Sequence, residues 1–211
     1  MPSAVLGHSS AGPLRRGVTG YDAAMKDTTA NPWRRVSRRV AYENPWIVIN
    51  HDEVIRPDGR PGIYGVVHFV HRAIGVAPLD TERDAVLLVG QFRYALDRYS
   101  WEIPEGGGRF DEEPEVAARR ELVEETGYSG GTWRRLCRCD LSNSVTDEEV
   151  VLFAATDLVP GTASPDGTEQ LEQRWVPFDE AMAMVASGEI GDAMTIIALQ
   201  QLALERAASR P

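Results

Sequence analysis

The sequence predicts an α/β sandwich, in which helices cover a β-sheet, with an antiparallel β extension before it. Three observations support this fold class: short apolar runs separated by turn residues, a helical segment in the middle of the chain, and two helical segments near its end. Strands combined with a central and a terminal helical layer bury their apolar faces by stacking in layers. With 211 residues, 43% of them hydrophobic, the chain can form one large domain with an extension.

The first predicted element is a hairpin. Apolar runs at Trp46–Val54 and Gly62–His71 flank the turn residues Pro57-Asp58-Gly59, a pattern that predicts two antiparallel strands. Residues 1–30 mix Gly, Ser, Pro and charges without periodicity, which predicts a disordered extension. We therefore expect three parts: this extension, a hairpin subdomain over residues 31–72, and the main domain over residues 73–211.

The main domain shows further strands and two terminal helices. Helices are expected over Asp179–Ser187, which ends near Gly188, and over Asp192–Ala208. Val159–Gln173 is rich in Pro, Gly, Ser and acidic residues, which predicts a long loop. The apolar runs that predict strands are Val86–Val89, Trp133–Cys139, Val150–Ala155 and Trp175–Phe178.

The central helix lies between Pro114 and Gly127. Proline fits the first turn of a helix, where its missing N–H has no intrahelical role, and glycine fits the left-handed residue that often ends one. Three carboxylates, Glu121, Glu124 and Glu125, stand at i, i+3 and i+4 and so share one face. Such close anions repel each other, and a hard divalent cation that takes carboxylate oxygens would reverse this penalty.

The neighbours of these carboxylates fit the same interpretation. Leu122 lies about 100° around the helix from them and can face the core. Arg120 can hold a neighbouring carboxylate in place. A solvated, Glu-rich helix face is the alternative, and the glycines and arginine at fixed offsets argue against it.

The segment from Gly106 to Tyr128 has the complete spacing G-x5-E-x7-R-E-U-x-E-E-x-G-U, where U is apolar or aromatic. This spacing resembles the signature box of the Nudix hydrolases. The resemblance extends over Val40–Ala208 and implies a Nudix-type α/β/α sandwich with a mixed β-sheet and an N-terminal antiparallel β extension.

The resemblance also implies roles for individual residues. Glu121, Glu125 and Glu169 are the predicted catalytic residues, and Arg93 is the predicted substrate-binding residue, with a surface ion pair as its alternative. Glu112 and Arg120 are expected to orient the helix. The general base is left open among Asp166, Glu169 and Glu172, or none is needed. The predicted ligands of Mg²⁺, for which Mn²⁺ could substitute, are Glu105 through its backbone carbonyl, Glu121, Glu124, Glu125 and Glu169.

Three further segments resemble the branch that cleaves ADP-ribose and other nucleoside diphosphate sugars: Gly90–Arg93 with Trp101–Gly106, Leu141–Glu149, and Glu169–Leu199. The branch implies hydrolysis to a nucleoside monophosphate and a sugar phosphate, and a homodimer built by the N-terminal hairpin. Members specific for ADP-ribose usually carry a Ser-Pro-Gly turn where this chain has Ser142-Asn143-Ser144. Because the proline is absent, other nucleoside diphosphate sugars, such as GDP-mannose, stay possible substrates. The alternatives are a housecleaning pyrophosphatase for nucleoside triphosphates or dinucleoside polyphosphates and a non-catalytic nucleotide-sugar-binding module.

Composition limits the partners. The net charge of −10 argues against nucleic acid and anionic membranes, which both require a basic surface. Cys137 and Cys139 form a C-x-C pair without a second pair or a nearby His, which favours two reduced strand cysteines over a metal site. No apolar run is long enough to span a membrane, and the first residues lack a secretory signal. We therefore expect a cytoplasmic protein.

Overall fold

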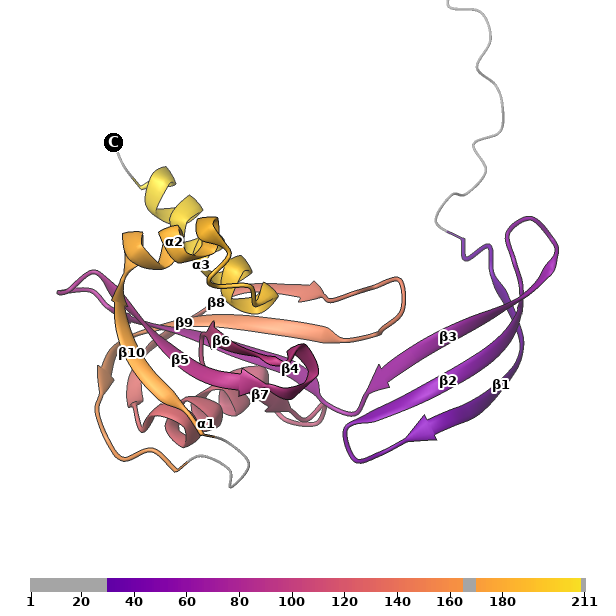
Figure 1. Ribbon diagram of the computed structural model, residues 1–211, viewed down its shortest axis with the longest axis horizontal. Coiled ribbons are helices and arrows are strands. Elements are labelled where there is room, and N and C mark those ends of the chain that lie inside the picture. The colour runs from indigo at the N-terminus through magenta and orange to yellow at the C-terminus, as the bar shows by residue number, and fades with distance from the viewer. Residues whose placement is uncertain (1–29, 165–169, 210–211) are drawn as a thin grey trace, which may run out of the picture.

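The computed structural model describes residues 30–164 and 170–209, which form two β-sheets joined end to end (Figure 1). A three-stranded sheet from the N-terminal part extends away from the larger sheet, which carries the helices. The predicted α/β sandwich with an N-terminal β extension is confirmed. Most of the extension predicted to be disordered, residues 1–29, lies outside the described residues. In the described part, no helix is long and apolar enough to cross a membrane.

The N-terminal sheet consists of β1 (Arg34–Glu43), β2 (Ile47–Ile55) and β3 (Pro61–Phe69), all antiparallel. The predicted hairpin is β2–β3, and its turn uses Gly59 with φ of 80°, a left-handed conformation that suits glycine. Strand β1 was not predicted from the sequence. Every residue of β1 is exposed, so no buried face imposes an alternating apolar pattern on this strand.

The larger sheet is mixed. Its strand order is β10-β5-β4-β9-β8, with β6 paired to β5 and β7 paired to β4. The β4–β9 pair is parallel and the other pairs are antiparallel. A short 3-10 helix, η1 (Tyr94–Leu96), joins β5 to β6. The strands are β4 (Arg72–Asp80), β5 (Ala85–Arg93), β6 (Arg98–Glu102), β7 (Glu105–Gly108), β8 (Ser129–Asp140), β9 (Glu149–Val159) and β10 (Glu172–Pro177).

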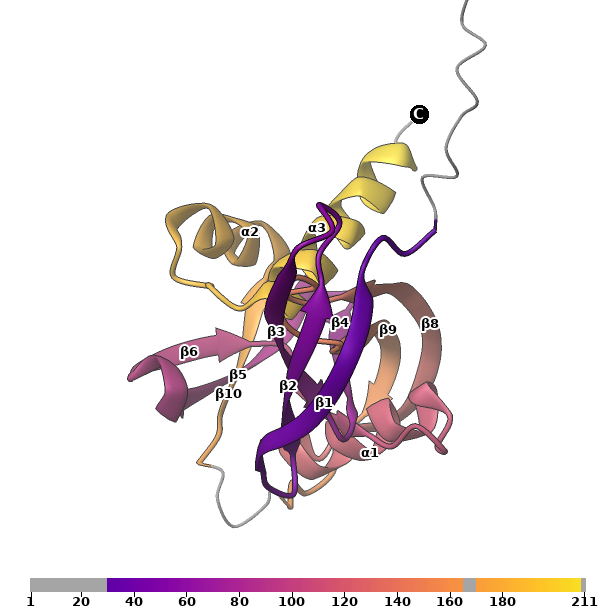
Figure 2. The ribbon, with the colours of Figure 1, turned by 90° about the vertical axis from the view of Figure 1, so that its right-hand side faces the viewer.

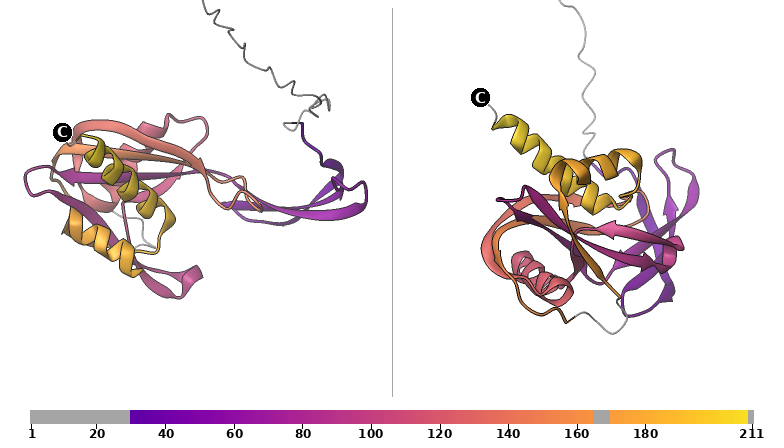
Figure 3. Two further views of the ribbon diagram at one scale, coloured as in Figure 1. Left: turned by 90° about the horizontal axis from the view of Figure 1, so that it is seen from above. Right: turned by 60° about the vertical axis from the view of Figure 1, so that its left-hand side comes forward.

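Helices cover both faces of this sheet (Figure 3). On one face lies α1 (Pro114–Thr126), and on the other lie α2 (Phe178–Ser187) and α3 (Ala193–Ala208). Strand β9 serves both cores because its successive side chains point to opposite faces. Val151 and Phe153 pack towards α1, whereas Val150 and Leu152 pack towards α2 and α3.

One residue was assigned to the wrong element, and strand β4 was missed. Phe178 was expected to end a strand, but β10 ends at Pro177 and Phe178 begins α2. Its ring is buried against α3, so its apolar character reflects core packing rather than strand structure. Strand β4 was not predicted. Its Gly75 is packed so closely that a Cβ added there would lie 2.9 Å from a methyl carbon of Leu152.

The N-terminal sheet, which lies in front of the larger sheet in Figure 2, is held to it by the loop between β8 and β9. The backbone N–H of Val67 in β3 donates to the carbonyl of Val145 at 2.8 Å, and the Tyr64 hydroxyl donates to the carbonyl of Ser144 at 2.6 Å. Asp147 accepts from the N–H of Phe69 at 3.2 Å. The loop that follows the box is therefore anchored by the N-terminal sheet.

Candidate active site

The helix that carries the box glutamates begins and ends as predicted. Pro114 occupies its first turn, and Gly127 ends it with φ of 78° while its N–H donates to the carbonyl of Val123 at 2.9 Å. A Cβ at Gly127 would also lie 2.6 Å from the backbone nitrogen of Ala163. Glycine is therefore required both by the turn and by the chain that crosses it. Leu122 is fully buried between α1 and the sheet, as expected.

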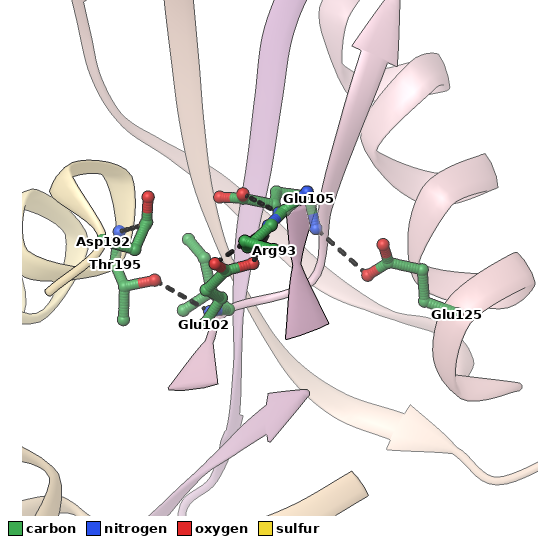
Figure 4. Close-up of polar contacts among 7 residues, drawn as sticks. Arg93, Glu102, Glu105, Glu125, Asp192 and Thr195 are labelled. Carbon is green, nitrogen blue, oxygen red and sulfur yellow. Dashed lines mark hydrogen bonds and ion pairs between the residues drawn. The ribbon is translucent and has the colours of Figure 1, made fainter. Parts of the chain in front are cut away.

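Glu125 faces strand β7. Its side chain is 2% exposed, and its Oε2 accepts a hydrogen bond from the backbone N–H of Glu105 at 3.1 Å (Figure 4). The carbonyl of Glu125 accepts from the side-chain amide of Gln173 at 3.0 Å. A carboxylate from the helix is thus fixed beside the backbone of residue 105, whose carbonyl was the predicted metal ligand.

Glu121 lies against the same strand because Gly106 leaves room for it. A Cβ built on Gly106 would lie 2.3 Å from both Cδ and Oε2 of Glu121, so the carboxylate occupies the space that any other side chain would fill. This contact explains in physical terms why the box opens with glycine. Glu121 and Glu125 therefore both meet the backbone of β7.

Arg120 binds two of the box carboxylates, Glu121 and Glu124. Its Nη1 donates to Glu121 at 2.7 Å and to Glu124 at 3.1 Å, and its Nη2 donates to the carbonyl of Gly107 at 2.9 Å. Glu112 lies 3.8 Å from the same guanidinium. The expected orienting role of Arg120 and Glu112 matches these contacts. Glu124 remains 43% exposed, so its other oxygen can face solvent or a ligand.

These residues fit a hard divalent cation. The donors are carboxylate oxygens from one helix face, and the adjacent glycine backbone lets the Glu121 carboxylate lie directly against it. Oxygen-rich surroundings of this kind are what such ions take. The positive charge of Arg120 offsets part of the repulsion among the three glutamates. Glu169, the fifth predicted ligand, lies outside the described residues, as does Asp166.

Arg93 lies beside this set and contacts two carboxylates. Its Nε donates to both oxygens of Glu102 at 3.0 Å, and its Nη2 donates to Glu102 and to Oε1 of Glu105 at 2.5 Å each. Burial lowers the pKa of Arg93, but the bond to Glu102 and the charges of Glu105 and Glu102 raise it, so the net pKa lies above its ordinary value. Arg93 is thus a permanent cation at the edge of the site.

Glu105 also takes part through its side chain, a role that was not predicted from the sequence. Burial, with the charges of Asp192 and Glu102, raises the pKa of Glu105 well above its usual range. Glu102, Glu105 and Asp192 place one carboxylate oxygen each within 4.8 Å of one another, and they are the one such group of three that the described residues form. Asp192 caps α3 by accepting from the N–H of Thr195 at 2.7 Å.

This cluster was only partly predictable from the sequence. Glu102 and Glu105 belong to the Trp101–Gly106 segment that resembles the sugar-nucleotide branch, and Asp192 was expected to begin a helix. Nothing in their spacing shows that the start of the last helix meets the end of β6. Glu172, one of the candidate bases, begins β10 and accepts from the Tyr99 hydroxyl at 3.1 Å.

Comparisons with known proteins agree with this geometry. The family model described as NUDIX domain matches residues 70–196, and a model described as nucleoside diphosphate sugar hydrolase N-terminal domain matches residues 33–67. The crystal structure of an ADP compounds hydrolase superposes with a TM-score of 0.76 at 18% identity, covering 85% of this chain and 97% of that one.

Curated relatives carry several substrate names. An ADP-ribose pyrophosphatase of Bacillus subtilis is 36% identical over 82% of this chain and 94% of its own length. A CMP-5'-(N-acetyl-N-hydroxy-3-aminopropyl)phosphonate hydrolase of Streptomyces rubellomurinus is 32% identical over 79% of this chain and 80% of its own. A GDP-mannose pyrophosphatase of Salmonella paratyphi B is 35% identical over 58% of this chain and 69% of its own.

Proposed function

The chain belongs to the Nudix hydrolase family, and on that basis we propose that it cleaves the diphosphate bond of ADP-ribose or other nucleoside diphosphate sugars. The products would be a nucleoside monophosphate and a sugar phosphate. The observation that carries this proposal is the pair Glu121 and Glu125, fixed against the glycine backbone of β7 with Arg93 beside them. The match of residues 33–67 to a sugar-hydrolase N-terminal model supports the substrate class.

Nudix enzymes generally use a divalent metal, and we propose Mg²⁺, with Mn²⁺ as a substitute. The carbonyl of Glu105 and the carboxylates of Glu121, Glu124, Glu125 and Glu169 would hold it. When bound, the metal would neutralise diphosphate charge and lower the pKa of a water molecule. Around it, this chain's residues have separate tasks: Arg120 holds the carboxylates in place, and Arg93 presents a cation to a phosphate oxygen. Asp166, Glu169 or Glu172 would take up the proton of the attacking water, or a metal-bound hydroxide would need no separate base.

The assembly proposed here is a homodimer in which residues 31–72 form the dimerisation subdomain and residues 73–211 the hydrolase domain. The N-terminal sheet and its turns support this because several of their apolar side chains are exposed, among them Val36 at 58%, Trp46 at 68% and Ile63 at 66%. Exposed apolar groups gathered on a small sheet are typical of a protein interface. The cytoplasm is the proposed compartment, consistent with the free thiols of Cys137 and Cys139.

We propose that the enzyme accepts several sugar nucleotides. The backbone of the β8–β9 loop is anchored at Ser144 and Val145, but the side chains of Ser142 and Asn143 are exposed and offer adaptable donors and acceptors. At least two nucleoside diphosphate sugars besides ADP-ribose should be cleaved with kcat/KM values within about 100-fold.

The test is a phosphate-release screen with a coupled phosphatase, run with Mg²⁺ and then Mn²⁺. The panel comprises ADP-ribose, ADP-glucose, GDP-mannose, UDP-glucose, a CMP–phosphonate conjugate, diadenosine polyphosphates and nucleoside triphosphates. Triphosphates should be poorer substrates than the best sugar nucleotide. If triphosphates or dinucleoside polyphosphates are the best substrates, the protein is a housecleaning pyrophosphatase instead. If sugar nucleotides bind but nothing is cleaved, the protein is a non-catalytic binding module.

A further inference from the structure

Most of the hydrogen-bond donors of Arg93 are already engaged within the protein. Its Nε donates to Glu102, and its Nη2 donates to Glu102 and to Glu105 (Figure 4). An arginine holds a phosphate best through two parallel N–H donors on neighbouring nitrogens. The contacts that Arg93 makes in the described part of the chain leave only Nη1 for a substrate, so this residue alone cannot hold a phosphate in that way.

A second arginine lies directly across from Arg93. Arg98 begins β6, and it is the register partner of Arg93 where β5 and β6 pair. Side chains opposite each other in an antiparallel pair lie on the same face, with Cβ atoms about 4.5–5.5 Å apart. Because side chains alternate along a strand, Arg98 also shares its face with Glu102, four residues further on. Arg98 therefore belongs to the face that carries the pair of Arg93 and Glu102.

The position of Gly191 shows where the guanidinium of Arg98 lies. A Cβ built on Gly191 would lie 3.0 Å from Nη2 and 3.8 Å from Cζ of Arg98, so the guanidinium covers this glycine. The next residue is Asp192, whose carboxylate oxygen lies within 4.8 Å of those of Glu102 and Glu105. Arg98 is exposed, and among the residues that the structure describes its side chain has neither a hydrogen bond nor a salt bridge. All five of its N–H donors are therefore available at the rim of the site.

We propose that Arg98 is a substrate-binding residue that holds the diphosphate through two guanidinium nitrogens, while Arg93 adds one. The proposal rests on the proposed function, in which the substrate is a nucleoside diphosphate sugar. Its diphosphate is anionic, and a guanidinium is always charged and matches a phosphate with a planar pair of donors. An arginine that served only the fold would pair with Asp192, which follows the glycine that the guanidinium covers, and Arg98 does not.

The test compares wild type with Arg98→Ala and Arg98→Lys, and thermal melting checks that each variant is folded. Calorimetry measures the binding of an uncleavable α,β-methylene analogue of ADP-ribose in the presence of Mg²⁺. Arg98→Ala should weaken this binding at least about tenfold, because hydrogen bonds between charged groups are lost. It should raise KM for ADP-ribose by a similar factor while kcat stays within about threefold of wild type. Lysine keeps the charge but not the planar pair of donors, so Arg98→Lys should fall between the other two.

Adenosine, which has no phosphate, shows whether Arg98 acts on the diphosphate. Its inhibition constant should be the same in wild type and in Arg98→Ala. The matched control is Arg135→Ala, which removes an exposed arginine from β8, the edge strand remote from β5, and should leave both measurements unchanged. Wild-type binding of the analogue in Arg98→Ala or in Arg98→Lys, or an equal loss of affinity for the analogue and adenosine, would overturn the proposal.

The two proposals fail separately. A wild-type enzyme that cleaves no sugar nucleotide contradicts the proposed function, whatever the variants do. If the wild type cleaves sugar nucleotides and Arg98→Ala keeps the wild-type KM and analogue affinity, only the role of Arg98 is overturned.

Discussion

Replacing Gly106 with alanine should separate activity from stability. The new Cβ would lie 2.3 Å from Cδ and Oε2 of Glu121 and 2.7 Å from Oε1, whereas nonbonded carbon contacts are favourable near 3.5 Å. The carboxylate must therefore move by about 1 Å. A displacement of that size in a reacting group costs about 10²-fold in rate, which corresponds to about 2.7 kcal/mol of transition-state stabilisation.

Stability should change little in the same variant. Gly106 does not use a left-handed backbone conformation, so alanine fits its dihedral angles, and the group that has to yield is the end of a flexible side chain. We expect thermal melting within a few degrees of wild type, a fall of about 10²-fold in kcat/KM, and weaker Mn²⁺ binding measured by electron paramagnetic resonance.

Gly107→Ala is the matched control. A Cβ there would lie 3.5 Å from His71, which is an ordinary contact, and the carbonyl that Arg120 binds is retained. Its activity should stay within about threefold of wild type. If Gly106→Ala keeps wild-type turnover and Mn²⁺ affinity, Glu121 does not act from the position seen in the structure, and the reasoning fails.

Three more predictions follow from the same site and its support. Glu121→Gln and Glu125→Gln should each lower kcat by orders of magnitude while the melting temperature holds or rises slightly, because one of three repelling anions is removed; normal turnover in both at saturating Mg²⁺ would place the site elsewhere. Leu122→Ala, at a fully buried position, should lower the free energy of unfolding, measured with urea, by about 2–5 kcal/mol. The control Val123→Ala should lower it by less than about 1 kcal/mol, and equal losses in the two variants would contradict the packing of α1. Light scattering should give twice the chain mass of 23.3 kDa; a monomer at micromolar concentration would refute the dimer.

Local rules explain why the central helix and its carboxylates could be predicted. A first-turn proline, a terminal glycine and glutamates at i, i+3 and i+4 depend only on residues within a few positions of each other. The structure confirms the bounds set by Pro114 and Gly127 and the burial of Leu122. The β2–β3 hairpin was predictable for the same reason, since Pro57-Asp58-Gly59 defines its turn.

Strands β1 and β7 were harder to predict from the sequence than the central helix. β1 exposes every residue and therefore shows no buried face in its sequence. β7 consists of Glu105 followed by three glycines, a composition that is unusual for a strand. It forms a strand because it pairs with β4, and Gly106 in it leaves the space that Glu121 occupies.

The sequence by itself determined the family, the α/β class and the helix that carries the box. Tertiary structure alone decided which groups surround Arg93. Glu102 ends β6, Glu105 begins β7, and Asp192 caps a helix far along the chain. The anchoring of Ser144 and Val145 on β3 likewise joins distant segments. Such contacts arise when sheet pairing and core packing bring remote residues together, and no local spacing rule encodes that distance.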